Sequence, residues 1–186
     1  MKRICVFCGS RAGRTASWRN AATALGTAIA ARGIELVYGG GGRGMMGAVA
    51  DAALAADGRV IGVIPRDLFL REHLHKGITE LRAVEGMLER KSLMASLSDG
   101  FISLPGGIGT MDELFEMWTW AQLGIHDKPS VLLNIDGYYD ALIAFLDHMT
   151  DAGYLEPHQR VQLRVATSAD DALQDLLQAA VPPTDG

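Results

Sequence analysis

The sequence has little that would suit a nucleic-acid or membrane partner. Its 17 Lys and Arg are outnumbered by 22 Asp and Glu, which gives a formal net charge of −5 at pH 7. A nucleic-acid groove usually needs a basic surface. No apolar run approaches the roughly 20 residues of a bilayer-spanning helix, and Ile4–Cys8 is too short for a signal-peptide core. We therefore expect no nucleic-acid partner, no membrane partner and a cytoplasmic location.

Cysteine is scarce, and its two occurrences, Cys5 and Cys8, form a Cys-x-x-Cys. Redox-active pairs of this spacing lie where a helix begins, because the helix N-terminus lowers the thiol pKa. These two lie in a predicted strand, where a separation of three residues puts them on opposite faces. Few metal-ligating side chains surround them in the sequence. We predict two buried core cysteines and no metal site.

Short apolar runs alternate with segments of helical period along the chain, and most runs are continuous, as in parallel strands covered on both faces. The alternation predicts one nucleotide-binding α/β domain over 1–181, a Rossmann-like, doubly wound parallel sheet of about seven strands with helices on both faces. Residues 182–186 are predicted to be a frayed tail. The predicted strands are Arg3–Cys8, Ile34–Tyr38, Arg59–Ile64, Thr79–Val84, Gly100–Leu104, Ser130–Asn134 and Val161–Val165. The predicted helices are Trp18–Ile29, Gly44–Ala56, Gly86–Leu97, Thr110–Leu123, Tyr138–Asp151 and Ala169–Ala180.

Glycine-rich turns follow the first, second and fifth predicted strands, at Gly9-Ser10, Gly39–Gly44 and Gly106–Gly109. In a doubly wound sheet these turns meet at the carboxyl edge of the strands. Glycine lets backbone N–H groups approach a ligand closely, and a helix N-terminus attracts anions. We expect Ser10, Gly41 and Gly44 near the phosphate or ribose of a ligand.

Two familiar nucleotide-binding patterns are missing. A dinucleotide site needs G-x-G-x-x-G after the first strand and an acidic residue after the second. The chain has only Gly9–Gly13 and then a glycine at these places, and it contains no Gly-Lys-Ser/Thr of a P-loop. The turns therefore favour a smaller phosphate ester.

Two charged residues have competing interpretations. Thr110-x-x-Glu113 has the spacing of a capping box, which would make Glu113 a structural residue. A phosphate at the same helix N-terminus would compete with that cap and place Glu113 beside a phosphorylated metabolite. Arg90, between Met87 and Met94 on one helical stripe, fits either a solvated charged face or a partly buried cleft that binds phosphate or a carboxylate. The residues alone leave both questions open.

Two elements at this spacing resemble the LOG (Lonely Guy) family. Pro105–Glu113 matches its P-G-G-x-G-T-x-x-E signature, and Met87–Lys91 matches its M-x-x-R-K element, while Val6–Ser10, Gly39–Gly47 and Thr119–Pro129 match further stretches. The resemblance implies hydrolysis of the N-glycosidic bond of adenine-type nucleoside 5′-monophosphates. The products would be ribose 5-phosphate and a free base, either an N6-modified cytokinin or plain adenine.

The resemblance also assigns roles by position. Arg90 and Glu113 would form the catalytic pair, without a metal or another cofactor. The family is typically homodimeric, and the partner subunit completes the site. The residues that match substrate-binding positions are Glu72, Lys91, Gly106, Gly107, Ile108, Gly109, Thr110, Met111, Asp112 and Thr119. Leu88, Ile108 and Asp112 depart from residues common in the family, and these departures bear on base preference.

Two other functions are alternatives to hydrolysis, namely a non-catalytic carrier and a lysine decarboxylase. A non-catalytic carrier of a nucleotide or of molybdenum cofactor, on a similar fold, would bind AMP without releasing adenine. The carboxylate in the phosphate turn disfavours that function. A lysine decarboxylase would normally hold pyridoxal phosphate on a Schiff-base lysine. The available lysines are Lys2, Lys76, Lys91 and Lys128, and Lys91 is better explained at the phosphate-ester site.

Overall fold

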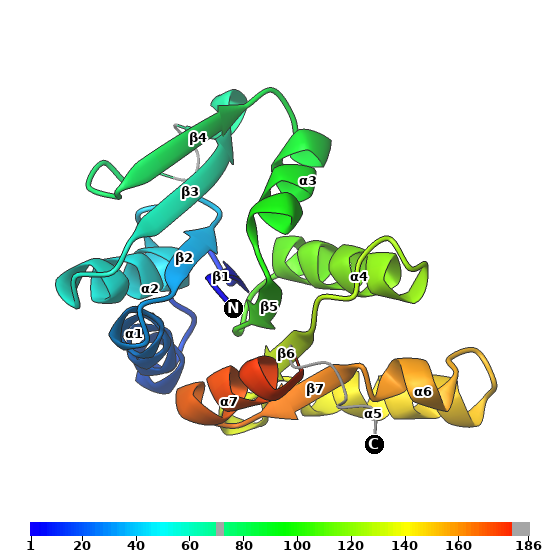
Figure 1. Cartoon of the computed structure of the whole chain (residues 1–186). Coiled ribbons are helices and arrows are strands. Elements are labelled where there is room, and N and C mark those ends of the chain that lie inside the picture. The colour runs from blue at the N-terminus through cyan, green and yellow to red at the C-terminus, as the bar shows by residue number, and fades with distance from the viewer. Residues whose placement is uncertain (70–72, 180–186) are drawn as a thin grey trace, which may run out of the picture.

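The computed structural model describes residues 1–69 and 73–179. Its seven strands pair in parallel in one sheet with the order β4-β3-β2-β1-β5-β6-β7 (Figure 1). The predicted doubly wound α/β fold is therefore confirmed. The strands are β1 (Arg3–Phe7), β2 (Glu35–Tyr38), β3 (Val60–Pro65), β4 (Glu80–Val84), β5 (Gly100–Ser103), β6 (Ser130–Leu133) and β7 (Leu163–Ala166).

The chain reverses its direction of winding beside β1. Strands β1 to β4 step outward on one side, and the chain then crosses back to place β5 on the other side of β1. The loops that follow β1 and β5 consequently diverge above the carboxyl edge of the sheet. In open parallel sheets this switch point forms a crevice that binds ligands.

Helices cover both faces of the sheet (Figure 1). On one face α1 (Ala16–Ala31), α2 (Gly44–Ala55) and α7 (Ala169–Ala179) pack over the strands in a shared apolar core. The opposite face carries α3 (Met87–Leu97), α4 (Ile108–Gln122), α5 (Asp140–Asp151) and the short α6 (Pro157–Arg160). In the described part of the chain, every helix is too short or too polar to cross a membrane.

The two cysteines follow the alternation of β1. Cys5 packs in the core beneath α3 and α4, whereas Cys8 packs in the core beneath α1 and α2. Both are buried and form no disulfide in the described residues. Burial raises the pKa of the Cys5 thiol well above its usual range, which opposes thiolate chemistry. The predicted burial on opposite faces is confirmed.

Two predicted starts, of a strand and of a helix, need correction, and one short helix was missed. The seventh strand begins at Leu163 rather than Val161, because Val161 lies exposed in the turn before it. The one-turn helix α6 was missed, since four residues are too few to show helical periodicity. Helix α4 begins at Ile108 rather than Thr110, which changes the interpretation of Glu113 below. The predicted tail, 182–186, lies outside the described residues.

Candidate active site

A cavity of about 460 Å³ opens at the switch point of the sheet. Its wall is formed by the loops after β1 and β5, by the first turns of α2, α3 and α4, and by side chains that include Trp18 and Tyr138. The volume is within the range of small-molecule sites, roughly 300–1,000 Å³. The predicted residues among its lining are Ser10, Arg90, Gly106, Gly107, Ile108, Gly109, Thr110 and Glu113.

Arg90 and Glu113 face each other in this cavity from α3 and α4. Nη2 of Arg90 lies 3.8 Å from Oε1 of Glu113, and both side chains are more than 90% buried. The same Nη2 donates a hydrogen bond of 3.2 Å to the carbonyl oxygen of Gly39, at the end of β2. A buried ion pair needs such additional partners, because desolvation opposes it. The structure thus brings the predicted catalytic pair together, while its chemical role stays a prediction.

The guanidinium of Arg90 occupies the space that a side chain at position 39 would take. A Cβ at position 39 would lie 2.1 Å from Nη2 of Arg90, far inside van der Waals contact. The glycine turn after β2 therefore positions the guanidinium, a role that sequence reasoning missed. Gly44 has a similar structural role, since a Cβ there would lie 2.4 Å from the carbonyl oxygen of Ser10. It lets the β1 and β2 loops touch and is not part of the cavity wall.

The N-terminus of α4 opens into the cavity without a side-chain cap. The N-cap residue is Gly107, and no side chain bonds to the first-turn N–H groups. The capping box predicted from Thr110 and Glu113 is wrong, because Thr110 is the third helical residue and Glu113 lies in the second turn. Among the described residues, apart from the chain neighbours and the helix's own backbone, nothing lies within 4 Å of a Cβ placed on Gly107 or Gly109. The uncapped N–H groups and this open space are what an anion needs at a helix N-terminus.

Comparisons with known proteins identify relatives of this chain. A family model described as "Possible lysine decarboxylase" matches residues 46–176. The cytokinin riboside 5′-monophosphate phosphoribohydrolase LOG1 of Arabidopsis thaliana is 49% identical over 175 residues, which cover 94% of this chain and 82% of the relative. The enzyme of the same description, LOG, from Oryza sativa subsp. japonica is 49% identical over 177 residues, covering 95% and 72%. The chain belongs to the LOG family.

Solved structures similar to this LOG-family chain share its fold. The molybdenum cofactor carrier protein of Chlamydomonas reinhardtii superposes with a TM-score of 0.72 at 24% identity, covering 96% of this chain and 97% of the other. The molybdenum cofactor binding protein of Rippkaea orientalis gives 0.74 at 22% identity, covering 97% and 99%. At these identities the likeness concerns the fold alone.

Several residues predicted from the LOG resemblance do not line the cavity of their own chain. Lys91 pairs instead with two carboxylates on α4, at 3.0 Å from Oδ2 of Asp112 and 2.8 Å from Oε2 of Glu116. Burial lowers the pKa of Lys91, but its hydrogen bonds to Glu116 and Asp112 outweigh burial and raise that pKa. The other predicted residues outside the described lining are Asp112 itself, Gly41, Gly44, Met111 and Thr119. Glu72 lies outside the described residues.

Apolar side chains line the same cavity as the Arg90–Glu113 pair. Met45, Met46 and Met87 line it together with Leu68 and Trp18. Of these residues, only Met87 was predicted beside a possible cleft, because an apolar side chain at helical spacing carries no sign that it borders a cavity. Among the described residues, no three His, Cys, Asp or Glu side chains come together as metal ligands.

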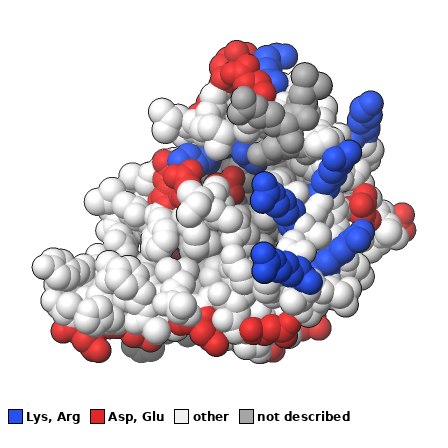
Figure 2. Space-filling model, turned by 180° about the vertical axis from the view of Figure 1, so that it is seen from behind, with Lys and Arg blue, Asp and Glu red and all other residues white. Residues whose placement is uncertain are grey.

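The acidic net charge is unevenly distributed over the surface. Figure 2 shows Lys and Arg side chains grouped on one side of the rear face and Asp and Glu along its lower margin. Arg11, an exposed residue of the β1–α1 loop, lines the cavity itself. An anionic ligand can therefore meet local positive charge at this site despite the charge of the whole chain.

Proposed function

We propose that this chain hydrolyses the N-glycosidic bond of adenine-type nucleoside 5′-monophosphates, either cytokinin riboside 5′-monophosphates or plain AMP. The observation that carries the proposal is the buried Arg90–Glu113 pair in the same cavity as the uncapped N-terminus of α4. The names of relatives with about half of their residues identical support the substrate class.

The proposed chemistry follows from the charge that develops on the sugar. As the bond between C1′ and the base nitrogen breaks, its electron pair leaves with the base and the ribose becomes oxocarbenium-like. The Glu113 carboxylate is placed to stabilise this positive charge and to orient the attacking water. Water then adds to C1′, and its proton neutralises the departing base. Arg90 holds the carboxylate in place, and phosphate at α4 supplies binding energy that fixes the sugar.

We also propose that a second copy of the chain completes the site. Leu88 on α3, Phe115 on α4 and Leu123 at the C-cap of α4 are exposed apolar side chains. Thr119 is exposed on α4 between Phe115 and Leu123. A homodimer that buries them would bring Thr119 to the partner's cavity. Sedimentation at assay concentration is expected to show a dimer, whereas a fully active monomer would contradict it.

The description "Possible lysine decarboxylase" fits the site poorly. A Schiff-base lysine must supply a neutral amine, which needs a lowered pKa. Lys91, the lysine beside Arg90, is instead held by two carboxylates, and its pKa is raised. We therefore expect no sustained carbon dioxide release from lysine with added pyridoxal phosphate.

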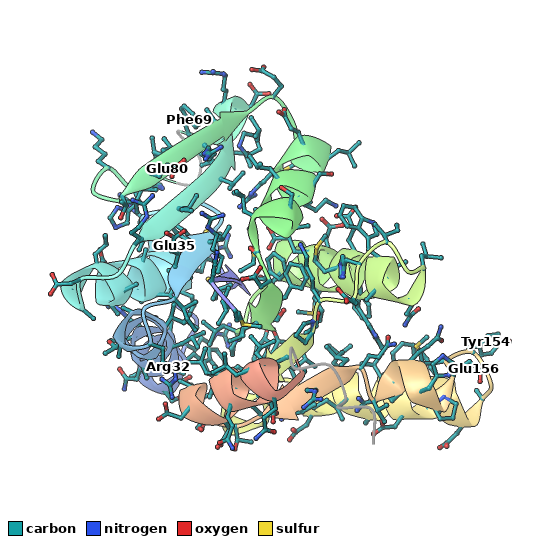
Figure 3. The ribbon with its side chains drawn as sticks, in the orientation of Figure 1. Arg32, Glu35, Phe69, Glu80, Tyr154 and Glu156 are labelled. Atoms are coloured by element: carbon teal, nitrogen blue, oxygen red, sulfur yellow. The ribbon has the colours of Figure 1, made fainter. Side chains whose placement is uncertain are left out.

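The experiment is incubation with a panel of nucleoside monophosphates, with released bases measured by chromatography. Glu113→Gln keeps the shape of the side chain and removes its charge, so base release is expected to fall about 100- to 1,000-fold. The matched control is Glu156→Gln, since Glu156 is exposed and lies near the α5–α6 turn, away from the centre of the sheet (Figure 3). Tight binding of AMP by the wild type, without release of a base from any nucleotide of the panel, would favour a carrier and reject hydrolysis.

A further inference from the structure

Two neighbouring tyrosines reach from the loop after β6 to the loop after β5. The hydroxyl of Tyr139 donates a hydrogen bond of 2.6 Å to the carbonyl of Leu104, and that of Tyr138 donates one of 2.5 Å to the carbonyl of Gly106. Burial raises the pKa of the Tyr139 hydroxyl, so that it remains a donor. The β5–α4 loop is thus held from one side by two O–H donors.

The carbonyl between these two is also occupied. The backbone N–H of Gly9, in the loop after β1, donates to the carbonyl of Pro105 at 3.2 Å. Three successive carbonyls of the β5–α4 loop, those of Leu104, Pro105 and Gly106, therefore accept hydrogen bonds from within the chain. A carbonyl oxygen turned toward a phosphate would repel it, and these bonds prevent that orientation.

The bond from Tyr138 also fixes a donor. A trans peptide unit is planar, so its C=O and the following N–H point in opposite directions. With the Gly106 carbonyl held by Tyr138, the N–H of Gly107 points away from Tyr138. Gly107 lines the cavity and is the N-cap of α4. Its N–H therefore lies on the opposite side of this peptide from the Tyr138 hydroxyl, at the residue that precedes the first-turn N–H groups of α4.

We propose that Tyr138 is a positioning residue that sets the affinity of the α4 N-terminus for the substrate phosphate. The inference rests on the proposed function, because that function puts the 5′-phosphate at α4. Tyr138 would act through the Gly106–Gly107 peptide rather than on the reacting bond. Its loss should weaken phosphate binding and leave the chemical step almost unchanged.

The Tyr138 ring can keep its place without its hydroxyl. The ring meets Trp18 edge to face with centroids 5.2 Å apart, and it meets Tyr139 in the same way at 4.9 Å. The Tyr138–Gly106 hydrogen bond is solvent-exposed and Gly106 is half-buried, so loss of the hydroxyl leaves no deeply buried carbonyl without a partner. Tyr138→Phe is therefore a clean deletion of one bond, and its melting temperature is expected to stay close to that of the wild type.

The test compares wild type, Tyr138→Phe and Tyr154→Phe. Tyr154 is the matched control because it is 85% exposed and lies beyond α5, away from the sheet (Figure 3). Calorimetric titration with inorganic phosphate measures binding without turnover, and steady-state kinetics with the best nucleotide of the panel separates KM from kcat. For Tyr138→Phe we expect the phosphate Kd and the KM to rise about three- to tenfold. We expect kcat to change less than about twofold, because the lost interaction is present in ground and transition states alike.

The outcomes separate this inference from the proposed function. Unchanged phosphate affinity and KM in Tyr138→Phe would overturn it, as would a fall in kcat at constant KM or a wild type that binds no phosphate. A wild type that binds phosphate but releases no base would reject the proposed hydrolysis, while the titration would still decide the role of Tyr138.

Discussion

The two edges of the sheet use charge in opposite ways. At the amino edge, Glu35 of β2 accepts ion pairs from Arg3 at 2.6 Å and Arg59 at 3.0 Å, and Arg59 continues to Glu80 at 3.3 Å (Figure 3). These arginine side chains are 41% and 53% exposed. At the carboxyl edge, the Arg90–Glu113 pair is longer, at 3.8 Å, and almost fully buried. The shorter ion pairs thus lie at the solvent-exposed surface, whereas the longer Arg90–Glu113 pair lies in the cavity.

The difference separates stability from function. Exposed ion pairs contribute about 0–1 kcal/mol each, because water and salt screen them. A buried pair has a desolvation cost that can exceed its Coulombic gain, so the fold alone gives little reason to retain Arg90 and Glu113 there. Changes at the carboxyl edge should consequently alter activity more than stability, and changes at the amino edge should do the reverse.

After Glu113→Gln, the largest effect is expected from Gly39→Ala. The new Cβ would lie 2.1 Å from Nη2 of Arg90, and the guanidinium at the end of a flexible side chain can swing away. The pair with Glu113 would be lost while the fold survives. We expect kcat/KM to fall about 100-fold, as displacements of about 1 Å can do, and the melting temperature to fall as well, because the buried Glu113 carboxylate loses this cation.

The control for this variant is Gly77→Ala. Gly77 is exposed, and a Cβ there would meet only ordinary contacts with His75. Its kinetics should match the wild type. Full activity in Gly39→Ala would mean that catalysis does not need Arg90 in its observed position. It would then contradict the claim that the carboxyl edge of the sheet serves activity.

The sequence predicted the sheet well because burial on both faces leaves a local signal. Continuous apolar runs such as Ile4–Cys8 and Val131–Leu133 mark interior parallel strands. The capping box was wrong for a local reason too: Gly107 serves as the N-cap, so the helix begins before Thr110. A glycine N-cap leaves no side-chain signature in the sequence.

Only those site residues that belong to recognisable sequence motifs were predicted. Motif resemblance named Arg90 and Glu113, but their approach depends on how α3 and α4 cross the sheet edge. The hydrogen bonds from Arg90 to Gly39 and from Tyr138 to Gly106 join residues 51 and 32 positions apart. Such contacts are fixed by strand order, and no periodicity or spacing within either segment predicts them.

An intermediate effect is expected from Lys91→Met. Lys91 is mostly buried between Asp112 and Glu116, and the variant leaves the two carboxylates beside each other without a cation. The free energy of unfolding should fall by about 1–2 kcal/mol, less than for a fully buried pair because Asp112 is half-exposed. Chemical denaturation measures this, with exposed Lys76→Met as the control.

The pH dependence sharpens the Lys91 prediction. Its pKa is raised in the folded protein, so its stabilisation is complete below the ordinary lysine value and is lost as pH rises through the folded pKa. The difference in free energy of unfolding between wild type and Lys91→Met should therefore become smaller in strong alkali. A constant gap would show that Lys91 stabilises through packing of its side-chain stem instead of its charge.

The smallest effect is expected from Glu35→Gln at the amino edge. The hydrogen bond from Arg3 lowers the pKa of Glu35 below its ordinary value of 4.5 despite partial burial, so its contribution is present above that pH and is lost as pH falls through the folded pKa. At neutral pH the free energy of unfolding should fall by about 1 kcal/mol or less, and kcat/KM should not change. Denaturation curves at neutral pH and at pH about 3 measure the free energies of unfolding of wild type and Glu35→Gln, and the difference between them should shrink at the lower pH. Steady-state kinetics at neutral pH measures kcat/KM. If Glu35→Gln instead reduced activity as strongly as Gly39→Ala does, the two edges would be coupled, and the separation of stability from function would fail.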